Sequence, residues 1–364
     1  MTLSLGLENI IVSENDISLV DGQKGHLVYK GYWAKDLALN KSFEEVVFLL
    51  WNGTLPNDIE LKVFKRELSH SMKLDENIKK IIELLPANVD MLGVLRTAVS
   101  ALGTENFSWP PTKEQGITIL AKIPAIIAYR QNCLLKKEKI EPKPEFSLTE
   151  NYLYMLHGKV PEKTHVRALE AYLVLTAEHG LNASTFTSRV ISSTQSDMAS
   201  AITGAIGALK GPLHGGAPSE VDNMIEEIGS LSNAESWVRN KLENNEKIMG
   251  FGHRVYKTRD PRAEALSIIA SGFKEPWFEL SVGIEKLILK LLDEYKPGRK
   301  LYTNVEYYAV AVFRGVGIPK ELYTPTFTFS RVAGWVAHIL DQSNQNKLIR
   351  PQSKYIGIIP KCEE

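Results

Sequence analysis

Apolar residues recur at helical spacing along most of this chain, and this periodicity restricts its fold more than any other feature. The stretch 114–130 repeats an apolar residue every three or four positions. The stretch 161–179 does the same, and Gly180 is a natural stop for a helix there. A further helix is predicted over 43–50, with Ser42 as its N-cap. The sequence therefore predicts a mainly α-helical protein.

The only convincing β signal lies near the N-terminus. Residues 17–20 and 27–29 are rich in residues that favour strands, and Asp21-Gly22 between them is typical of a turn. We expect a small N-terminal β-hairpin ahead of the helices.

Composition argues against several classes of protein. The 43 basic residues balance 43 acidic ones, so no net charge attracts nucleic acid or an anionic membrane surface. The sequence has no run of 18 apolar residues that could span a membrane. Neither Cys133 nor Cys362 belongs to a CxxC pair, which argues against a zinc site or a disulfide framework. We expect a cytoplasmic protein with no nucleic-acid or membrane partner, and its 364 residues favour two lobes.

Three segments carry residues suited to chemistry. Residues 210–218 set His214 among three glycines and two prolines, which fits either close approach of a ligand or an ordinary helix-ending loop. Residues 250–262 hold a histidine and four cations, which fit either an anion site or a solvated basic loop. These five are His253, Arg254, Lys257, Arg259 and Arg262. Residues 301–308 hold Glu306 among apolar and aromatic neighbours, where burial would raise its pKa for proton abstraction; pairing with a core arginine is the alternative.

Taken together, the three segments resemble the citrate synthase family of the shorter bacterial and archaeal type. The resemblance rests on GPLHGGA at 211–217, GFGHRVYKTRDPR at 250–262 and NVE at 304–306, followed by Ser330-Arg331 and Arg350-Pro351. It covers nearly the whole chain, and three motifs in a fixed order are too specific for coincidence.

The resemblance implies a citrate synthase-like two-domain helical fold in a homodimer. A large helical domain would comprise residues 1–215 plus 321–364, and a small helical domain would comprise residues 216–320. The cleft between them would close over oxaloacetate and acetyl-CoA and exclude water from the thioester. No metal or other cofactor is implied.

The resemblance also implies roles for individual residues. Glu306 would remove a proton from the methyl group of acetyl-CoA, while a neutral His214 donates a hydrogen bond to the thioester oxygen. His253 would donate to the oxo group of oxaloacetate. The carboxylates of oxaloacetate would be bound by His179, Arg262 and Arg331, and by Arg350 from the partner subunit. CoA would lie along Ile248, Met249, Gly250, Phe251 and Gly252 and near Lys257, with Arg254 and Arg259 as weaker candidates for its phosphates.

One position departs from the family pattern, which usually reads NVD. Glu306 extends the carboxylate by one methylene, and a misplacement of ~1 Å can cost ~100-fold in rate. Some bacterial paralogues that resemble this chain also read NVE, so we expect a working enzyme that condenses acetyl-CoA with oxaloacetate and water to citrate and CoA. The alternatives are a 2-methylcitrate synthase, which uses propionyl-CoA, and a catalytically weak homologue that binds CoA or a metabolite.

Overall fold

Most of the chain is helical, as predicted. The computed structural model describes residues 4–7, 10–104, 107–214, 217–253, 255–273, 276–345 and 347–360. The first helices are α1 (Ala34–Asn40), α2 (Phe43–Asn52), α3 (Asp58–Ser71), α4 (Glu76–Leu84), α5 (Met91–Leu102), α6 (Lys113–Leu134), α7 (Leu148–His157), α8 (Lys163–Thr176), α9 (Ala183–Ser192) and α10 (Met198–Leu209). They are followed by α11 (Ala217–Ile228), α12 (Leu231–Glu243), α13 (Pro261–Ala270), α14 (Pro276–Tyr295), α15 (Val305–Gly315) and α16 (Tyr323–Gln345). Two 3-10 turns cover Leu5–Leu7 and Lys320–Leu322.

The predicted hairpin is confirmed and gains a third strand. Strand β1 (Ser18–Asp21) pairs antiparallel with β2 (His26–Tyr29), and β2 pairs with β3 (Tyr32–Trp33). Leu19 lies opposite Val28 in this register. Sequence reasoning missed β3 because two residues are too few to show an alternating pattern.

Local capping explains where the predicted helices begin and end. Ser42 forms a capping box with Glu45 at the start of α2, as expected for an N-cap. The helix predicted over 161–179 ends earlier, at Thr176. The Tyr29 hydroxyl donates to the main-chain oxygen of Glu178 at 2.8 Å, which ties the irregular loop after α8 to the sheet. This contact between distant segments is invisible in the local sequence.

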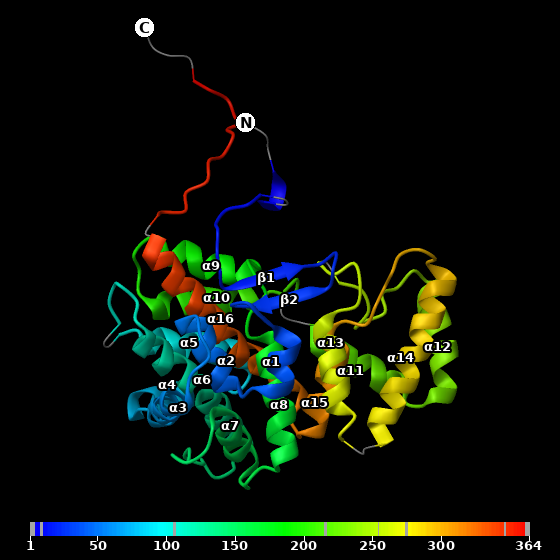
Figure 1. The fold of residues 1–364 in the computed structure, drawn as a ribbon, viewed down its shortest axis with the longest axis horizontal. Coiled ribbons are helices and arrows are strands. Elements are labelled where there is room, and N and C mark those ends of the chain that lie inside the picture. Colours follow the sequence, from blue (N-terminus) through cyan, green and yellow to red (C-terminus); the bar gives the residue numbers. More distant parts are fainter. Residues whose placement is uncertain are drawn as a thin grey trace.

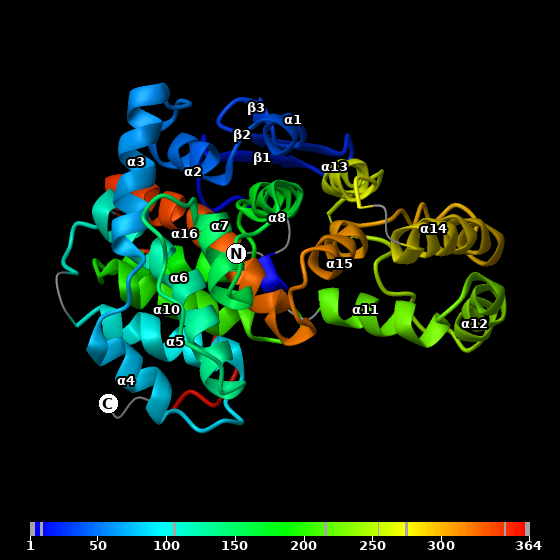
Figure 2. The same cartoon turned by 90° about the horizontal axis from the view of Figure 1, so that it is seen from below.

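Helix α16 is the central element of the core. It packs against α2, α6, α8, α9 and α10, and Trp335 at its middle is fully buried. Helices α11 to α15 lie to one side of this group (Figures 1 and 2). Within that side, α12 packs against α14, and α11 and α13 pack against α15. The division into domains at residues 216 and 320 stays a prediction. None of the described helices is both long and apolar enough to cross a membrane.

Candidate active site

The Asp260 carboxylate joins the starts of α13 and α15. Its Oδ1 accepts from the main-chain N and from Nε of Arg262, both at 3.0 Å, and its Oδ2 accepts from Arg262 Nη2 at 2.9 Å. Oδ2 also accepts from the main-chain N of Val305, the first residue of α15, at 3.1 Å. Asp260 and Arg262 are 2% and 4% exposed. This buried pair fixes Arg262 close to Glu306, the second residue of α15.

A glycine turn brings His253 to the same place. Gly250 and Gly252 have positive φ angles of 83° and 82°, which residues with a side chain rarely adopt. Asn304 donates from its main-chain N to Gly250 O at 2.9 Å and from Nδ2 to Gly252 O at 3.0 Å. Asn304 also caps α15, because its Oδ1 accepts from the main-chain N of Glu306 at 3.1 Å. His253 and Glu306 are therefore positioned by one set of contacts.

His253 and Arg262 present two donors toward one point. His253 Nδ1 accepts from the main-chain N of Val255 at 3.0 Å and of Tyr256 at 3.1 Å. In the neutral ring the proton then sits on Nε2, and Arg262 Nη2 lies 3.2 Å from that nitrogen. Two N–H groups side by side repel each other unless an oxygen accepts from both. A carbonyl or carboxylate oxygen of a ligand fits this arrangement.

His179 adds a further ring to this group. Its centroid lies 5.7 Å from that of His253, and its Nε2 lies 3.1 Å from the Tyr256 hydroxyl. The Arg262 guanidinium in turn lies 5.5 Å from the centroid of the Tyr256 ring. His179, His253 and Arg262 thus converge, although residues 179 and 253 are far apart in the sequence.

Arg331 enters from α16. Its Nε donates to Thr176 O at 2.8 Å, its guanidinium lies 4.6 Å from the centroid of the Phe327 ring, and its side chain is buried. Its two terminal nitrogens make no hydrogen bond within the described part of the chain, so they are available to an anion. The positive charge of Arg331 is one of the influences that lower the pKa of three site residues, although burial raises that of one of them overall. Arg331 therefore lies within electrostatic reach of all three. These are His179, His214 and Glu306.

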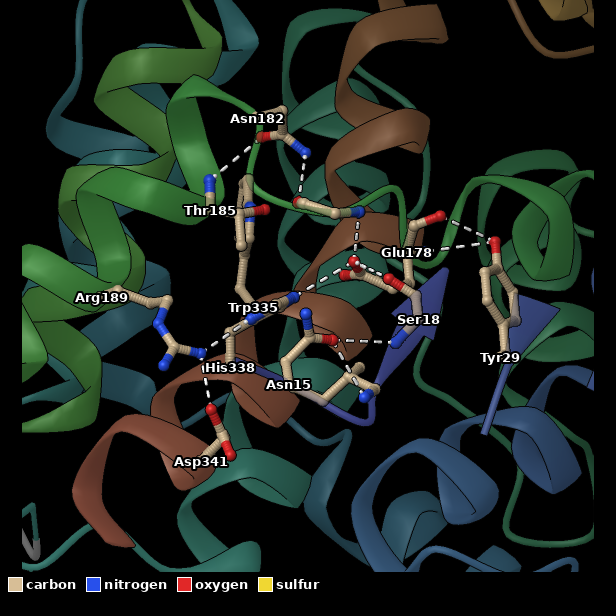
Figure 3. Close-up of polar contacts among 12 residues, drawn as sticks. Asn15, Ser18, Tyr29, Glu178, Asn182, Thr185, Arg189, Trp335, His338 and Asp341 are labelled. Carbon is tan, nitrogen blue, oxygen red and sulfur yellow. Dashed lines mark hydrogen bonds and ion pairs between the residues drawn. The ribbon is translucent and has the colours of Figure 1, made fainter. Parts of the chain in front are cut away.

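His214 is held by the Ser184 hydroxyl. Its Nε2 lies 2.9 Å from Ser184 Oγ, which also accepts from Trp335 Nε1 at 3.2 Å. Ser184 Oγ donates to Asn182 Oδ1 at 2.7 Å, so this hydroxyl connects Asn182 with His214. Asn182 is also the N-cap of α9, accepting from the main-chain N of Thr185 at 3.1 Å (Figure 3). The start of α9 therefore sets the orientation of the His214 ring.

Glu306 is suited to accept a proton near neutral pH. Burial raises its pKa to about 7, and the negative charge of Asp260 adds to the rise, whereas the positive charges of Arg262 and Arg331 oppose it. The rise has the direction expected from its apolar and aromatic surroundings. Its carboxylate accepts no hydrogen bond from another described residue, so it is not the structural partner of a core arginine.

The three histidines are neutral at physiological pH. Burial lowers the pKa of His214 to about 4, and Arg331 adds to the effect. Burial and Arg262 lower the pKa of His253 to about 4. Burial and the same arginine hold the pKa of His179 well below its usual range. A neutral imidazole donates a hydrogen bond without bringing a positive charge into a site that already holds two arginines.

The residues predicted to contact CoA lie at the edge of this group. Ile248 and Met249 precede the glycine turn. Phe251 lies between its two glycines and forms an isolated bridge with Thr303 next to α15. Lys257 and Arg259 are exposed on the following segment. Arg254 lies outside the described residues.

Arg350 is the one predicted carboxylate ligand that is not part of the described site. It is exposed and belongs to an extended segment, 347–360, that leaves the body of the molecule after α16 (Figure 1).

Sequence reasoning missed several supporting residues. Asp260, Tyr256 and Ser184 have ordinary local surroundings in the sequence, and only the fold brings them behind the predicted site. Tyr172 was missed for the same reason. Its hydroxyl is buried without a hydrogen-bond partner among the described residues, and the negative charge of Glu306 adds to the burial that holds its pKa well above the usual range.

Comparisons with known proteins agree with this geometry. A family model described as "Citrate synthase, C-terminal domain" matches residues 6–352. The chain belongs to the citrate synthase family. Citrate synthase 2 of Bacillus subtilis is 40% identical over 98% of this chain and 96% of its own length. A 2-methylcitrate synthase of Mycobacterium tuberculosis is 39% identical over 97% of this chain and 90% of its own.

The fold of this chain is also similar to that of a solved structure. The ternary complex of carboxymethyl coenzyme A and oxaloacetate with citrate synthase from Thermoplasma acidophilum is 32% identical, with a TM-score of 0.89. The match covers 100% of this chain and 98% of that one. The comparisons confirm the predicted family, the mainly α-helical fold and an acyltransferase activity of the citrate synthase type.

The raised pKa of Glu306 predicts the pH dependence of this enzyme. A base acts only when ionised, so kcat/KM should fall as the pH drops through about 7. The pKa values of about 4 for His214 and His253 put their protonation well below that range. Steady-state rates from about pH 5.5 to about pH 8.5 measure the profile. An acidic limb centred near the ordinary glutamate pKa would contradict the assignment.

Proposed function

We propose that this chain condenses acetyl-CoA with oxaloacetate and water to give citrate and CoA. The observation that carries the proposal is the convergence of a proton acceptor with a raised pKa, neutral imidazoles and buried guanidinium groups. The acceptor is Glu306, the imidazoles belong to His179, His214 and His253, and the guanidinium groups to Arg262 and Arg331. These groups match the chemical needs of a weak carbon acid and a dicarboxylate acceptor.

From the family resemblance, oxaloacetate would bind before acetyl-CoA. Among the described residues, Asp260 is the only carboxylate that forms an ion pair with an arginine of this site. The terminal nitrogens of Arg331 and the ring of His179 would hold its carboxylates. Its oxo oxygen would accept from His253 Nε2 and Arg262 Nη2, whose 3.2 Å separation suits one shared acceptor. This contact polarises the oxo carbon for attack. Together with the carboxylate contacts it also orients that carbon, and good orientation of two reactants lowers a barrier by on the order of 7 kcal/mol.

Acetyl-CoA would then lose a methyl proton to the Glu306 carboxylate. The charge that develops on the thioester oxygen would be stabilised by a hydrogen bond from His214, whose ring is held by Ser184. The resulting enolate carbon attacks the oxo carbon of oxaloacetate, which forms one carbon–carbon bond and breaks the π bond of the oxo group. The oxo oxygen takes up a proton from His253 Nε2, and the methyl proton held by Glu306 balances the one that His253 gives. Water then cleaves the thioester of this product, which releases citrate and CoA.

The CoA site and the homodimer are proposed from the family resemblance. CoA would lie along Ile248–Gly252 and near Lys257. We propose a homodimer in which Arg350 reaches the partner's site; the exposed, extended segment that carries Arg350 supports this, since exposed Tyr355, Ile356 and Ile358 there call for a covering surface. A reaction without metal or other cofactor, and a cytoplasmic location, stay predictions from the sequence.

Replacement of Glu306 by glutamine tests the role of the base. Glu306→Gln should abolish oxaloacetate-dependent thiol release from acetyl-CoA, because the amide accepts no proton, while oxaloacetate binding by calorimetry stays within about threefold of wild type. Glu306→Asp is the matched control: it restores a carboxylate and should retain activity within ~100-fold of wild type. Near-normal turnover of Glu306→Gln would refute the assignment. A wild-type protein that binds oxaloacetate without any turnover would favour the weak homologue.

The competing activity is 2-methylcitrate synthesis from propionyl-CoA. The similar identities to a citrate synthase and a 2-methylcitrate synthase, 40% and 39%, keep it open. The two acyl groups differ by one methylene, which is worth about 1–3 kcal/mol, or about 10- to 200-fold. We expect kcat/KM with oxaloacetate to be at least about 10-fold higher for acetyl-CoA. A preference for propionyl-CoA of that size would identify a 2-methylcitrate synthase instead.

A further inference from the structure

One face of α16 carries three side chains that each support a different part of the proposed site. Arg331, Trp335 and His338 follow one another at spacings of four and three residues, so they lie along one side of the helix. Arg331 faces the anion-binding groups, and Trp335 donates to Ser184, which holds His214. His338 reaches Glu178, the residue before His179, at 3.1 Å from Nε2 to Oε1 (Figure 3).

Glu178 is a buried carboxylate to which the proposed chemistry assigns no role. It is fully buried, and its Oε1 accepts from Ser18 Oγ at 2.9 Å and from Gly180 N at 2.5 Å as well as from His338. Burial opposes its ionisation, but the nearby His338 and Arg331 hold its pKa below the usual value. A buried ionised carboxylate of this kind is costly unless its donors stay in place. Its position is therefore tightly defined.

The direction of the hydrogen bonds at His338 is set by its other neighbour, Arg189. Arg189 Nη1 lies 3.1 Å from His338 Nδ1, and a guanidinium only donates, so Nδ1 is the acceptor. The proton of the neutral ring is then on Nε2, which donates to Glu178. Arg189 Nη1 in turn donates to Asp341 Oδ2 at 2.8 Å (Figure 3). Its Nε donates to Gln342 Oε1 at 3.0 Å. The order of donors along this buried path is thus Arg189 to His338 to Glu178.

The same path continues from Glu178 to His214. Gly180 N donates to the carboxylate, and Gly180 O accepts from the main-chain N of Asn182 at 3.0 Å. Asn182 caps α9 and contacts Ser184, the hydroxyl that holds His214. Arg189 also lies on α9, so this series of hydrogen bonds begins and ends on the same helix.

Gly334 lets α16 approach this loop closely. A Cβ at residue 334 would lie 2.4 Å from both Ala177 O and Glu178 Oε2, and the main-chain N of Gly334 donates to Ala177 O at 3.1 Å. The loop that precedes α9 is therefore fixed against α16 with no space for even a methyl group.

We propose that Glu178 and His338 are positioning residues that set the geometry of His179 and His214 together. The inference rests on the proposed function, because it assigns those two histidines to the oxaloacetate and thioester subsites. Without His338, the Glu178 carboxylate loses a donor in a buried site and moves or takes up a proton. The loop from 177 to 182 then shifts, and a shift of ~1 Å at a reacting group costs on the order of 100-fold in rate.

Variants of His338 test this inference by oxaloacetate-dependent thiol release. His338→Phe removes both nitrogens, and we expect kcat/KM for oxaloacetate to fall by about 10- to 100-fold, with a raised KM for oxaloacetate. His338→Gln keeps a donor for Glu178 and an acceptor for Arg189, so it should stay within about threefold of wild type. Ser18→Ala removes the other side-chain donor to Glu178, and we expect about a 2- to 5-fold rise in KM for oxaloacetate.

Val336→Ala is the matched control for loss of packing. Val336 is buried on α16 but points toward Gly116 of α6, away from the path, so this variant should lower the Tm and leave KM unchanged. The inference is overturned if His338→Phe behaves like Val336→Ala, or if His338→Gln is as impaired as His338→Phe. If His338→Phe does not fold, an unchanged KM in Ser18→Ala overturns it. Absence of thiol release in the wild type would instead refute the proposed function.

Discussion

The buried ion pair between Asp260 and Arg262 is the interaction on which the candidate site most depends. Asp260 caps α13, pairs with Arg262 and accepts from Val305 at the start of α15. It therefore places the Arg262 guanidinium near the carboxylate of Glu306. The same negative charge adds to the rise in the pKa of Glu306. Breaking a buried pair of this kind costs about 3–5 kcal/mol, so the arrangement is not easily altered.

Burial and the charges of the arginines set the protonation states of the groups around this pair. The arginines and burial keep the histidines neutral, and burial raises the pKa of the carboxylate to about 7. In the proposed reaction, a dianionic acceptor would bind to fixed positive charges, while the weak carbon acid would meet a base and neutral donors. These conditions are the ones a condensation between a thioester methyl and an oxo acid requires.

Sequence reasoning predicted the helical fold, the hairpin and the convergent residues, because periodicity, capping and three family motifs are local signals. It predicted the helix over 161–179 too long, since the contact from Tyr29 that fixes the loop after α8 comes from nearly 150 residues away. The pairing of Ser184 with His214 and of His338 with Glu178 likewise spans distant segments, and no local pattern reports it. The raised pKa of Glu306 was predictable from its apolar neighbours, whereas the part played by Asp260 required the structure.

A crystal structure with oxaloacetate and carboxymethyl coenzyme A tests the central claim most directly. We expect the oxo oxygen to lie within hydrogen-bond distance of both His253 Nε2 and Arg262 Nη2. We also expect the Glu306 carboxylate within about 3.5 Å of the atom that replaces the acetyl methyl group, with His214 at the adjacent oxygen. Oxaloacetate bound away from Arg262 and Arg331, or a Glu306 carboxylate directed away from the bound CoA analogue, would contradict the claim.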